Sequence, residues 1–248
     1  MTDSEERRRA EALDHVHVPA VPPRIGPRRA RPPADLLAAL RGVPAAEVSD
    51  VVGRLYTMHP RIRPLYEPVR RAVGVALTVK AYPGDNLAVH GGLSLVRPDD
   101  VLVVSWSGYA DGCGSGAESL QVPISNGLQA VVIDGAWRDL EDLQRQDFPV
   151  FGRGSAAFSP TKREPGELNV PVECGDVVVE EGDVVVADGE AVVIVPRWCL
   201  DRVVGALAAK PRVAGQRSAA DLVEGTAART RLFAEAYRER GGQGRFAP

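Results

Sequence analysis

Cysteine is scarce in this sequence, and the spacing of its few cysteines excludes two classes of stabilised protein. Among 248 residues there are three cysteines, Cys113, Cys174 and Cys199, and none of them forms a CxxC pair. An odd number of distant cysteines suggests neither a disulfide framework nor a zinc site. Aromatic residues make up only 5% of the chain, which argues against a surface that stacks nucleic-acid bases.

Long apolar runs and an excess of positive charge are also missing. No apolar segment approaches the length of about 18 residues that a membrane-spanning helix needs, and no signal-peptide pattern is present. We therefore expect a soluble, cytoplasmic protein with no membrane partner. The formal net charge of −3 at pH 7 makes nucleic acid an unfavoured partner.

Proline and arginine are concentrated in residues 1–33, which include RRR at 7–9 and the segment VPAVPPRIGPRRARPP. Proline cannot continue a helix, and so polar a segment cannot bury apolar surface. We expect a flexible arm, either plainly disordered or wrapped around a neighbouring subunit.

Residues 34–197 alternate short apolar runs with amphipathic segments, which predicts one α/β domain with an added antiparallel part. The predicted helices span 35–40, 45–55, 86–95, 118–126 and 140–145, and Asp85 is placed to cap the third of them. The predicted strands span 72–82, 101–105, 130–133, 149–151, 170–172, 177–179, 184–187 and 191–196. Residues 198–248 predict a helical extension whose apolar stripe would pack at a subunit interface.

The most informative stretch is AVVIDGAWRDL, residues 130–140. Four apolar residues predict a strand buried on both faces, and Asp134-Gly135 ends it with a turn. Arg138 and Asp139 then lie at the mouth of the strand, where open α/β sheets bind ligands. Such a pair can bind an anion and a hydrated cation. The alternative is that both residues cap the next helix and form ordinary salt bridges.

Residues 107–120, SGYADGCGSGAESL, form a glycine-rich loop that precedes a predicted helix. Such a loop lets backbone N–H groups approach a carboxylate or phosphate closely. It has neither the GxGxxG pattern nor the Lys-Ser/Thr pair of a phosphate-binding loop, so it is not a nucleotide motif.

Taken in order, these motifs resemble the RraA-like superfamily. That superfamily includes 4-hydroxy-4-methyl-2-oxoglutarate/4-carboxy-4-hydroxy-2-oxoadipate aldolases, oxaloacetate decarboxylases and the regulator of ribonuclease activity A. The resemblance covers roughly residues 45–197. Besides the glycine-rich loop, it rests on VSDVVGRL (48–55), GVALTVKA (74–81), DNLAVH (85–90), RPDDVLVV (97–104), AVVIDGAWRD (130–139), PVFGRG (149–154) and the segment from Asn169 to Pro196.

The resemblance implies a β/β/α sandwich of the swivelling type, assembled as a homotrimer or hexamer with active sites at subunit interfaces. It implies that Asp139 is the direct protein ligand of Mg²⁺ or Mn²⁺ and that Arg138 contacts the substrate. It also implies that Asn86 reaches the same pocket. Backbone N–H groups of the glycine-rich loop would hold the substrate carboxylate, with Gly114, Gly116, Ala117, Glu118 and Ser119 as the loop positions.

The aldolases of this superfamily use two catalytic carboxylates, and we look for the residues that correspond to them in this chain. The aldolases carry an acidic residue directly after the glycine aligned with Gly116, where this chain has Ala117 followed by Glu118. Adjacent helix positions point about 100° apart. Glu118 is the candidate for this role, and Glu224 is the candidate for a Glu that the aldolases borrow from the C-terminal segment of a neighbouring subunit.

The resemblance implies a metal-dependent carbon–carbon lyase that acts on a small 2-oxo acid. Retro-aldol cleavage and oxaloacetate decarboxylation both leave pyruvate enolate, whose charge a metal and an arginine stabilise. Lys80 and Lys162 have no evident site for a Schiff base. Two alternatives remain open: a non-catalytic regulatory protein of the ribonuclease-regulator type, and a relative recruited to another metal-enolate reaction in a specialised pathway.

Overall fold

The structure is a computed structural model that describes residues 23–209 and 219–240. Its main sheet is built around β2 (Ala72–Lys80), whose residues are all buried except the last. Strand β2 pairs in parallel with β3 (Asp100–Ser105) on one side. On the other side, β11 (Val184–Ala187) pairs with the first half of β2 and β8 (Glu167–Leu168) pairs with its end, both antiparallel.

Further strands complete this sheet, and β5–β7 and β9–β10 form two separate two-stranded sheets. The sheet order is β1-β6-β4-β3-β2-β11-β12, with β8 off this path, and β3, β4 and β6 run parallel. The other strands are β1 (Arg63–Pro64), β4 (Ala130–Ile133), β5 (Ala136–Trp137), β6 (Val150–Gly152), β7 (Gly154–Ser155), β9 (Val172–Cys174), β10 (Val177–Val179) and β12 (Val192–Val195). The helices are α2 (Ala34–Leu40), α3 (Ala45–Val52), α4 (Leu87–Leu93), α5 (Gln121–Ser125), α6 (Leu140–Arg145), α7 (Leu200–Ala209) and α8 (Ala219–Glu239), with short 3₁₀ turns η1 (Arg54–Tyr56), η2 (Ala117–Leu120) and η3 (Arg197–Cys199).

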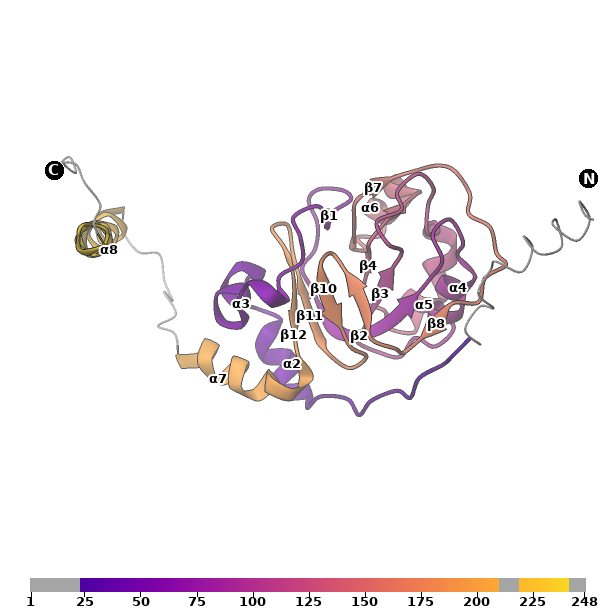
Figure 1. Cartoon of the computed structure of the whole chain (residues 1–248), viewed down its shortest axis with the longest axis horizontal. Coiled ribbons are helices and arrows are strands. Elements are labelled where there is room, and N and C mark those ends of the chain that lie inside the picture. Colours follow the sequence, from indigo (N-terminus) through magenta and orange to yellow (C-terminus); the bar gives the residue numbers. More distant parts are fainter. Residues whose placement is uncertain (1–22, 210–218, 241–248) are drawn as a thin grey trace, which may run out of the picture. The chain divides into compact units, whose positions relative to one another are not determined.

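The sheet is buried on both faces because successive side chains of a strand point to opposite sides. On β3, Leu102 and Val104 pack with α4 and α6, whereas Val101 and Val103 pack with the β9–β10 hairpin. A third apolar cluster joins α2, α3 and α7 to β11 and β12. Helices thus cover one face and the hairpin covers the other (Figure 1). This arrangement confirms the predicted α/β sandwich.

The helix predicted over 118–126 is divided in the structure. Residues Ala117–Leu120 form η2, and α5 follows from Gln121 to Ser125. Pro123 lies in α5 and lacks the N–H that a continuous helix would use there. The predicted cap of α4 is also shifted: the helix begins at Leu87, and the Leu87 N–H donates to Asp85 Oδ1 at 2.9 Å.

The part of the predicted arm that the structure describes, residues 23–33, lies against the domain. Ile25 forms a β-bridge with Leu168, and the Arg28 guanidinium pairs with the buried carboxylates of Asp100 and Glu181, each at 2.8 Å. Proline excludes a helix here but permits extended backbone. The buried carboxylates bind the arginine side chains through charge-assisted hydrogen bonds, which keeps this segment on the domain. Residues 1–22 lie outside the described residues.

The predicted C-terminal extension divides between two units. Helix α7 buries Leu200, Val203 and Leu207 in the third cluster, so the first unit extends to Leu207 rather than ending at residue 197. Helix α8 belongs to the second unit and exposes Val223, Leu232, Phe233 and Tyr237. Its packing on a partner subunit stays a prediction. Within residues 23–209 and 219–240, no helix is long and apolar enough to cross a membrane.

Candidate functional site

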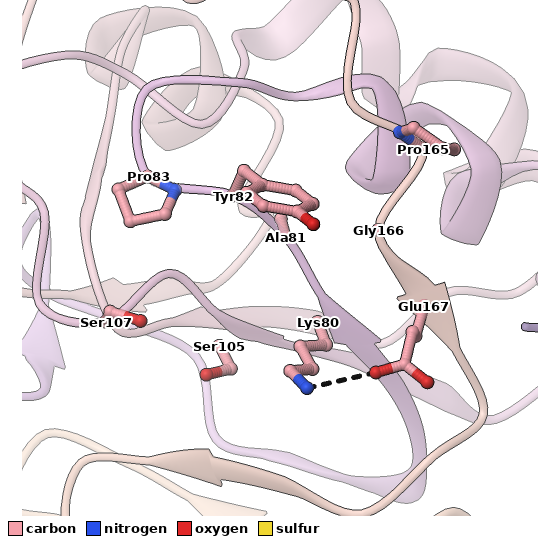
Figure 2. A pocket seen from close by; sticks show the side chains of 9 residues that line it. All are labelled: Lys80, Ala81, Tyr82, Pro83, Ser105, Ser107, Pro165, Gly166 and Glu167. Carbon is pink, nitrogen blue, oxygen red and sulfur yellow. Dashed lines mark hydrogen bonds and ion pairs between the residues drawn. The ribbon is translucent and has the colours of Figure 1, made fainter. Parts of the chain in front are cut away.

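Two pockets lie near the carboxyl ends of the parallel strands. The first, of about 360 Å³, lies beyond β2 and β3 and is shown in Figure 2. Its polar centre is an ion pair in which Lys80 Nζ and Glu167 Oε2 are 3.0 Å apart. None of the predicted site residues lines it. Because Lys80 and Glu167 pair with each other, neither charge is fully available to a ligand. The predicted substrate and metal residues lie elsewhere.

The second pocket, of about 570 Å³, contains most of the predicted site. Four segments form it: α4 with the residue before it, the glycine-rich loop with η2 and α5, the turn between β5 and α6, and the long loop between β7 and β8. Its lining residues include the predicted Asn86, Gly116, Glu118, Ser119, Arg138 and Asp139. Gly114 and Ala117 are buried and are not among the lining residues.

The Asp139 carboxylate is held in position by one backbone N–H of the glycine-rich loop. It has a left-handed conformation with φ of 60°, which Asp adopts more readily than most residues. It occupies the N-cap position of α6, but its side chain makes no capping hydrogen bond. Instead, Asp139 Oδ2 accepts a hydrogen bond of 3.1 Å from the Ala117 N–H. Asp139 is therefore the residue that precedes α6, as the helix-cap alternative requires, but its carboxylate does not cap the helix.

Arg138 presents its guanidinium to the same pocket. Buried Trp137 precedes it on β5, and the Arg138 N–H donates to Ser115 O at 3.2 Å. Arg138 Nε is 3.9 Å from Asp139 Oδ2, and Nη1 donates to Ser159 Oγ at 2.9 Å. Both side chains remain partly exposed, at 41% for Arg138 and 39% for Asp139, so each can reach a ligand in the pocket.

Asn86 is almost fully buried and has one unsatisfied atom. Its Nδ2 donates to Gly114 O at 2.8 Å, and because a carbonyl can only accept, this contact fixes the orientation of the amide. Asn86 Oδ1 is buried without a hydrogen-bond partner. Asn86 therefore keeps a buried oxygen acceptor without a partner, next to the pocket that the residue lines.

The glycine-rich loop comes close to Asp139, but some of its backbone N–H groups are already bonded within the protein and are not free to bind a ligand. A Cβ on Gly116 would lie 2.1 Å from Asp139 Oδ2, so a larger residue fits there only if the Asp139 carboxylate moves. The Gly114 and Ala117 N–H groups already donate to Ala136 O and Asp139 Oδ2. Glu118 and Ser119 lie in the first turn of η2, where N–H groups have no partner within the helix.

Positions 117 and 118 face different surroundings. The Ala117 side chain is buried in the apolar cluster that includes Leu120, whereas Glu118 is exposed and lines the pocket. Glu118 is therefore the carboxylate that this loop presents to the pocket. Glu224 is exposed on α8 in the second unit, and its role in the site stays a prediction.

A model of the family described as RraA-like, aldolase/RraA, matches residues 45–194, which is more than half of the chain. The chain belongs to the RraA-like family. This confirms the resemblance seen in the motifs.

Relatives of this RraA-like chain carry names of two kinds. A protein of Halalkalibacterium halodurans named "Putative 4-hydroxy-4-methyl-2-oxoglutarate aldolase" is 34% identical over 143 residues, which cover 58% of this chain and 68% of the relative. The solved structure of Streptomyces coelicolor RraAS2, described as an unusual member of the RNase ES inhibitor RraA protein family, is 27% identical. It has a TM-score of 0.63 and covers 72% of this chain and 92% of its own.

A third relative has a similar fold to this chain. The crystal structure of an uncharacterized protein from Pseudomonas syringae pv. tomato is 28% identical, with a TM-score of 0.66, and covers 74% of this chain and 87% of its own. The chain therefore shares a family with a protein named as an aldolase and with a protein named for ribonuclease inhibition.

The oxygen atoms of this RraA-like pocket suit a hard divalent cation. Asp139 supplies a carboxylate, and Asn86 Oδ1 is an acceptor without a partner. Among the described residues, no three His, Cys, Asp or Glu side chains gather as a metal cage. Mg²⁺ needs only one or two protein carboxylates and keeps several waters, so this donor set fits Mg²⁺ or Mn²⁺ better than a metal that requires a full protein shell.

Sequence reasoning did not assign several residues of the pocket to the site. Ser159 and Lys162 come from the loop after β7, and His90 and Cys113 line the same pocket. Burial, and then the nearby Lys162 charge, lower the pKa of His90, while burial raises the pKa of the Cys113 thiol. For Ser159 and Lys162, the length of the loop between β7 and β8 is a signal that the sequence offers, since long loops in compact domains are often functional.

Proposed function

We propose that this RraA-like protein cleaves a carbon–carbon bond of a small 2-oxo acid and releases pyruvate, with Mg²⁺ or Mn²⁺ held at Asp139. The observation that carries the proposal is the fixed pair of Arg138 and Asp139, whose Nε and Oδ2 atoms are 3.9 Å apart on the wall of one pocket. The similarity to a protein named as an aldolase supports it.

Arg138 has the role of stabilising negative charge on the reacting end of the substrate. When the bond between C3 and C4 breaks, its electron pair moves toward the 2-oxo oxygen. A permanently charged guanidinium placed beforehand stabilises that charge more than it stabilises the neutral ketone. A bound divalent ion would add Lewis-acid polarisation of the 2-oxo group. The first-turn N–H groups of Glu118 and Ser119 would hold the adjacent carboxylate.

Glu118 has the role of moving the proton. In retro-aldol cleavage the C4 hydroxyl gives its proton to a base as the C3–C4 bond breaks, and C3 then takes up a proton to give pyruvate. Glu118 is exposed on the pocket wall, close in sequence to the loop that holds Asp139. In decarboxylation no hydroxyl proton has to leave, so loss of Glu118 should impair retro-aldol cleavage more than oxaloacetate decarboxylation.

The direct test is pyruvate release from 4-hydroxy-4-methyl-2-oxoglutarate and from oxaloacetate, with Mg²⁺, with Mn²⁺ and with EDTA. Asp139→Asn should lower kcat by a factor of at least about 10² and weaken Mn²⁺ binding measured by calorimetry. Its fold should persist, because Asn can still accept the Ala117 N–H. Asp142→Asn on α6, whose carboxylate pairs with Arg145, is the matched control. Absence of pyruvate with both metals would overturn the proposal.

A second candidate is a regulatory protein that binds a ribonuclease without catalysis. The similarity to RraAS2 of Streptomyces coelicolor favours it. Inhibition of a purified ribonuclease of that class, unchanged by EDTA and by Asp139→Asn, would support it. A third, another metal-enolate reaction, would show as a rise in melting temperature with acids outside the aldolase substrates. A homotrimer or hexamer stays a prediction, to be measured by light scattering.

A further inference from the structure

The first pocket, beyond the ends of β2 and β3, has a polar side and an apolar side. Lys80 is paired across the sheet with Ser105 of β3 and with Glu167 of β8, so these three side chains leave the sheet on the same face. Figure 2 shows this polar row on one side of the cavity and Tyr82 with Pro83 on the other. The cavity of about 360 Å³ lies at the lower end of the range for small-molecule sites.

Both walls of this pocket are held by buried contacts. The Trp106 side chain is fully buried, and its Nε1 donates to the backbone oxygens of Tyr82 and Asp85. On the opposite wall, Gly166 has φ of 56°, and a Cβ there would overlap Lys80 O, so both the conformation and the close approach require glycine. The shape of the cavity is therefore set by the fold and does not depend on a ligand.

The charge of the polar row favours an anion. Glu167 forms ion pairs with two cations, Lys80 Nζ at 3.0 Å and Arg24 Nη2 at 3.2 Å. These three groups together carry one net positive charge. An ammonium has three N–H donors, so Lys80 can keep its pair with Glu167 and still donate to a ligand.

Two serine hydroxyls add hydrogen-bond donors beside this charge. Ser105 and Ser107 line the cavity, and Ser105 is only 9% exposed. Within the residues the structure describes, neither hydroxyl has a hydrogen-bond partner. A carboxylate between Lys80 and Ser105 would accept from both, while the rest of its molecule would lie against the apolar wall.

We propose that this pocket is a second small-molecule site, which binds a monocarboxylic acid with an apolar body. Lys80 and the serine hydroxyls hold the carboxylate, and the Tyr82 ring packs on the body. A second carboxylate is disfavoured, because Glu167 repels it. None of the lining residues belongs to the pocket of Arg138 and Asp139, so the inference does not rest on the proposed function.

The test is an NMR titration of the full chain with 3-phenylpropionate in EDTA, followed through the backbone amides. The amides of Ala81 and Gly166 should shift, with a Kd of about 1 mM or tighter for a ligand of this size. Propionate lacks the apolar body and 3-phenylpropan-1-ol lacks the charge, so each should bind at least about tenfold more weakly. An alcohol that binds as tightly as the acid would overturn the proposal.

Substitutions assign the binding to this pocket. Lys80→Met should weaken 3-phenylpropionate binding at least about tenfold, as expected for loss of a charge-assisted hydrogen bond, whereas Lys80→Arg should retain most of the affinity. The Lys80 side chain is 60% exposed, so the spectrum of Lys80→Met should remain that of the folded protein. Lys162→Met removes the same charge from the other pocket and should leave the affinity unchanged. Wild-type affinity in Lys80→Met, or shifts confined to the amides of Gly116 and Ser119, would overturn the proposal.

Discussion

At Gly116 the glycine-rich loop and the Asp139 carboxylate come so close that a side chain fits between them only if the carboxylate moves. The backbone at Gly116 is extended, with φ of −134°, so the requirement for glycine there comes from space and not from conformation. The same closeness lets the Ala117 N–H hold Asp139 Oδ2. One residue without a side chain thus permits the contact that orients the proposed metal ligand.

Gly116→Ala should displace the Asp139 carboxylate and lower activity while leaving the fold intact. The added Cβ would lie 2.1 Å from Asp139 Oδ2 and 3.2 Å from Arg138 Nε, so both groups must shift. We expect a loss in kcat of about 10²-fold, since misplacing a reacting group by about 1 Å costs that much. Gly154→Ala, where a Cβ meets nothing within 4 Å, is the control. Full activity in Gly116→Ala would show that the close contact between the loop and the Asp139 carboxylate does not matter for catalysis.

His90 reports on where Lys162 lies. Burial is the larger cause of its lowered pKa, and the Lys162 ammonium is the second. Lys162→Met should therefore raise the pKa of His90 measured by NMR. Because the folded pKa lies below the ordinary 6.5, the stability from neutral His90 is complete above that pH and falls as pH decreases through the folded pKa. An unchanged pKa in Lys162→Met would place the ammonium away from His90.

Among the elements, the loop after β7 is held by a single buried side chain, that of Asp85. Burial of Asp85 opposes its ionisation, but hydrogen bonds from Thr161, Leu87, Arg163 and Glu164 outweigh it, and the pKa of Asp85 lies below its ordinary value of 3.8. The stability that this carboxylate contributes is therefore present above about pH 4. It is lost as pH falls through the folded pKa.

Asp85→Asn should loosen the loop without unfolding the sheet. The charged acceptor is lost, and the free energy of unfolding should fall by about 1–3 kcal/mol. Hydrogen exchange should accelerate at the Thr161 and Arg163 amides. Asp147→Asn, at an exposed carboxylate 3.7 Å from Arg70, should change none of these. Unaltered exchange in Asp85→Asn would contradict its role in holding the loop.

At the scale of the whole molecule, residues 23–33 connect edges of the domain that are distant in sequence. Arg24 pairs with Glu167, Arg28 with Asp100 and Glu181, and Arg31 with Asp100. Asp100 begins β3 and is fully buried, and Arg28 and Arg31 form ion pairs with its carboxylate. The segment thus neutralises a charge that the sheet cannot itself satisfy.

Arg28→Met should lower the free energy of unfolding by about 3 kcal/mol, because it leaves buried carboxylates with less compensation. Arg28 is only 10% exposed, whereas Arg41 is 56% exposed in its pair with Asp99. Arg41→Met should cost less than about 1 kcal/mol, as exposed pairs do. Urea unfolding measures both. Equal effects of the two substitutions would show that burial of the Arg28 pair is not what matters.

The sequence by itself determined the long central strands of the sheet, though not the short strands β1 and β8, and the place of Arg138 and Asp139 at its edge. Runs such as Val101–Ser105 and Ala130–Ile133 are local patterns, and a turn directly after a strand puts the next residues at the edge of the sheet. The tertiary structure alone decided that Lys162 shares this pocket, that Glu118 rather than residue 117 faces it, and that Arg28 lies against Asp100. These are contacts between segments far apart in sequence. They depend on packing and on the pairing of buried charges, which no local pattern records.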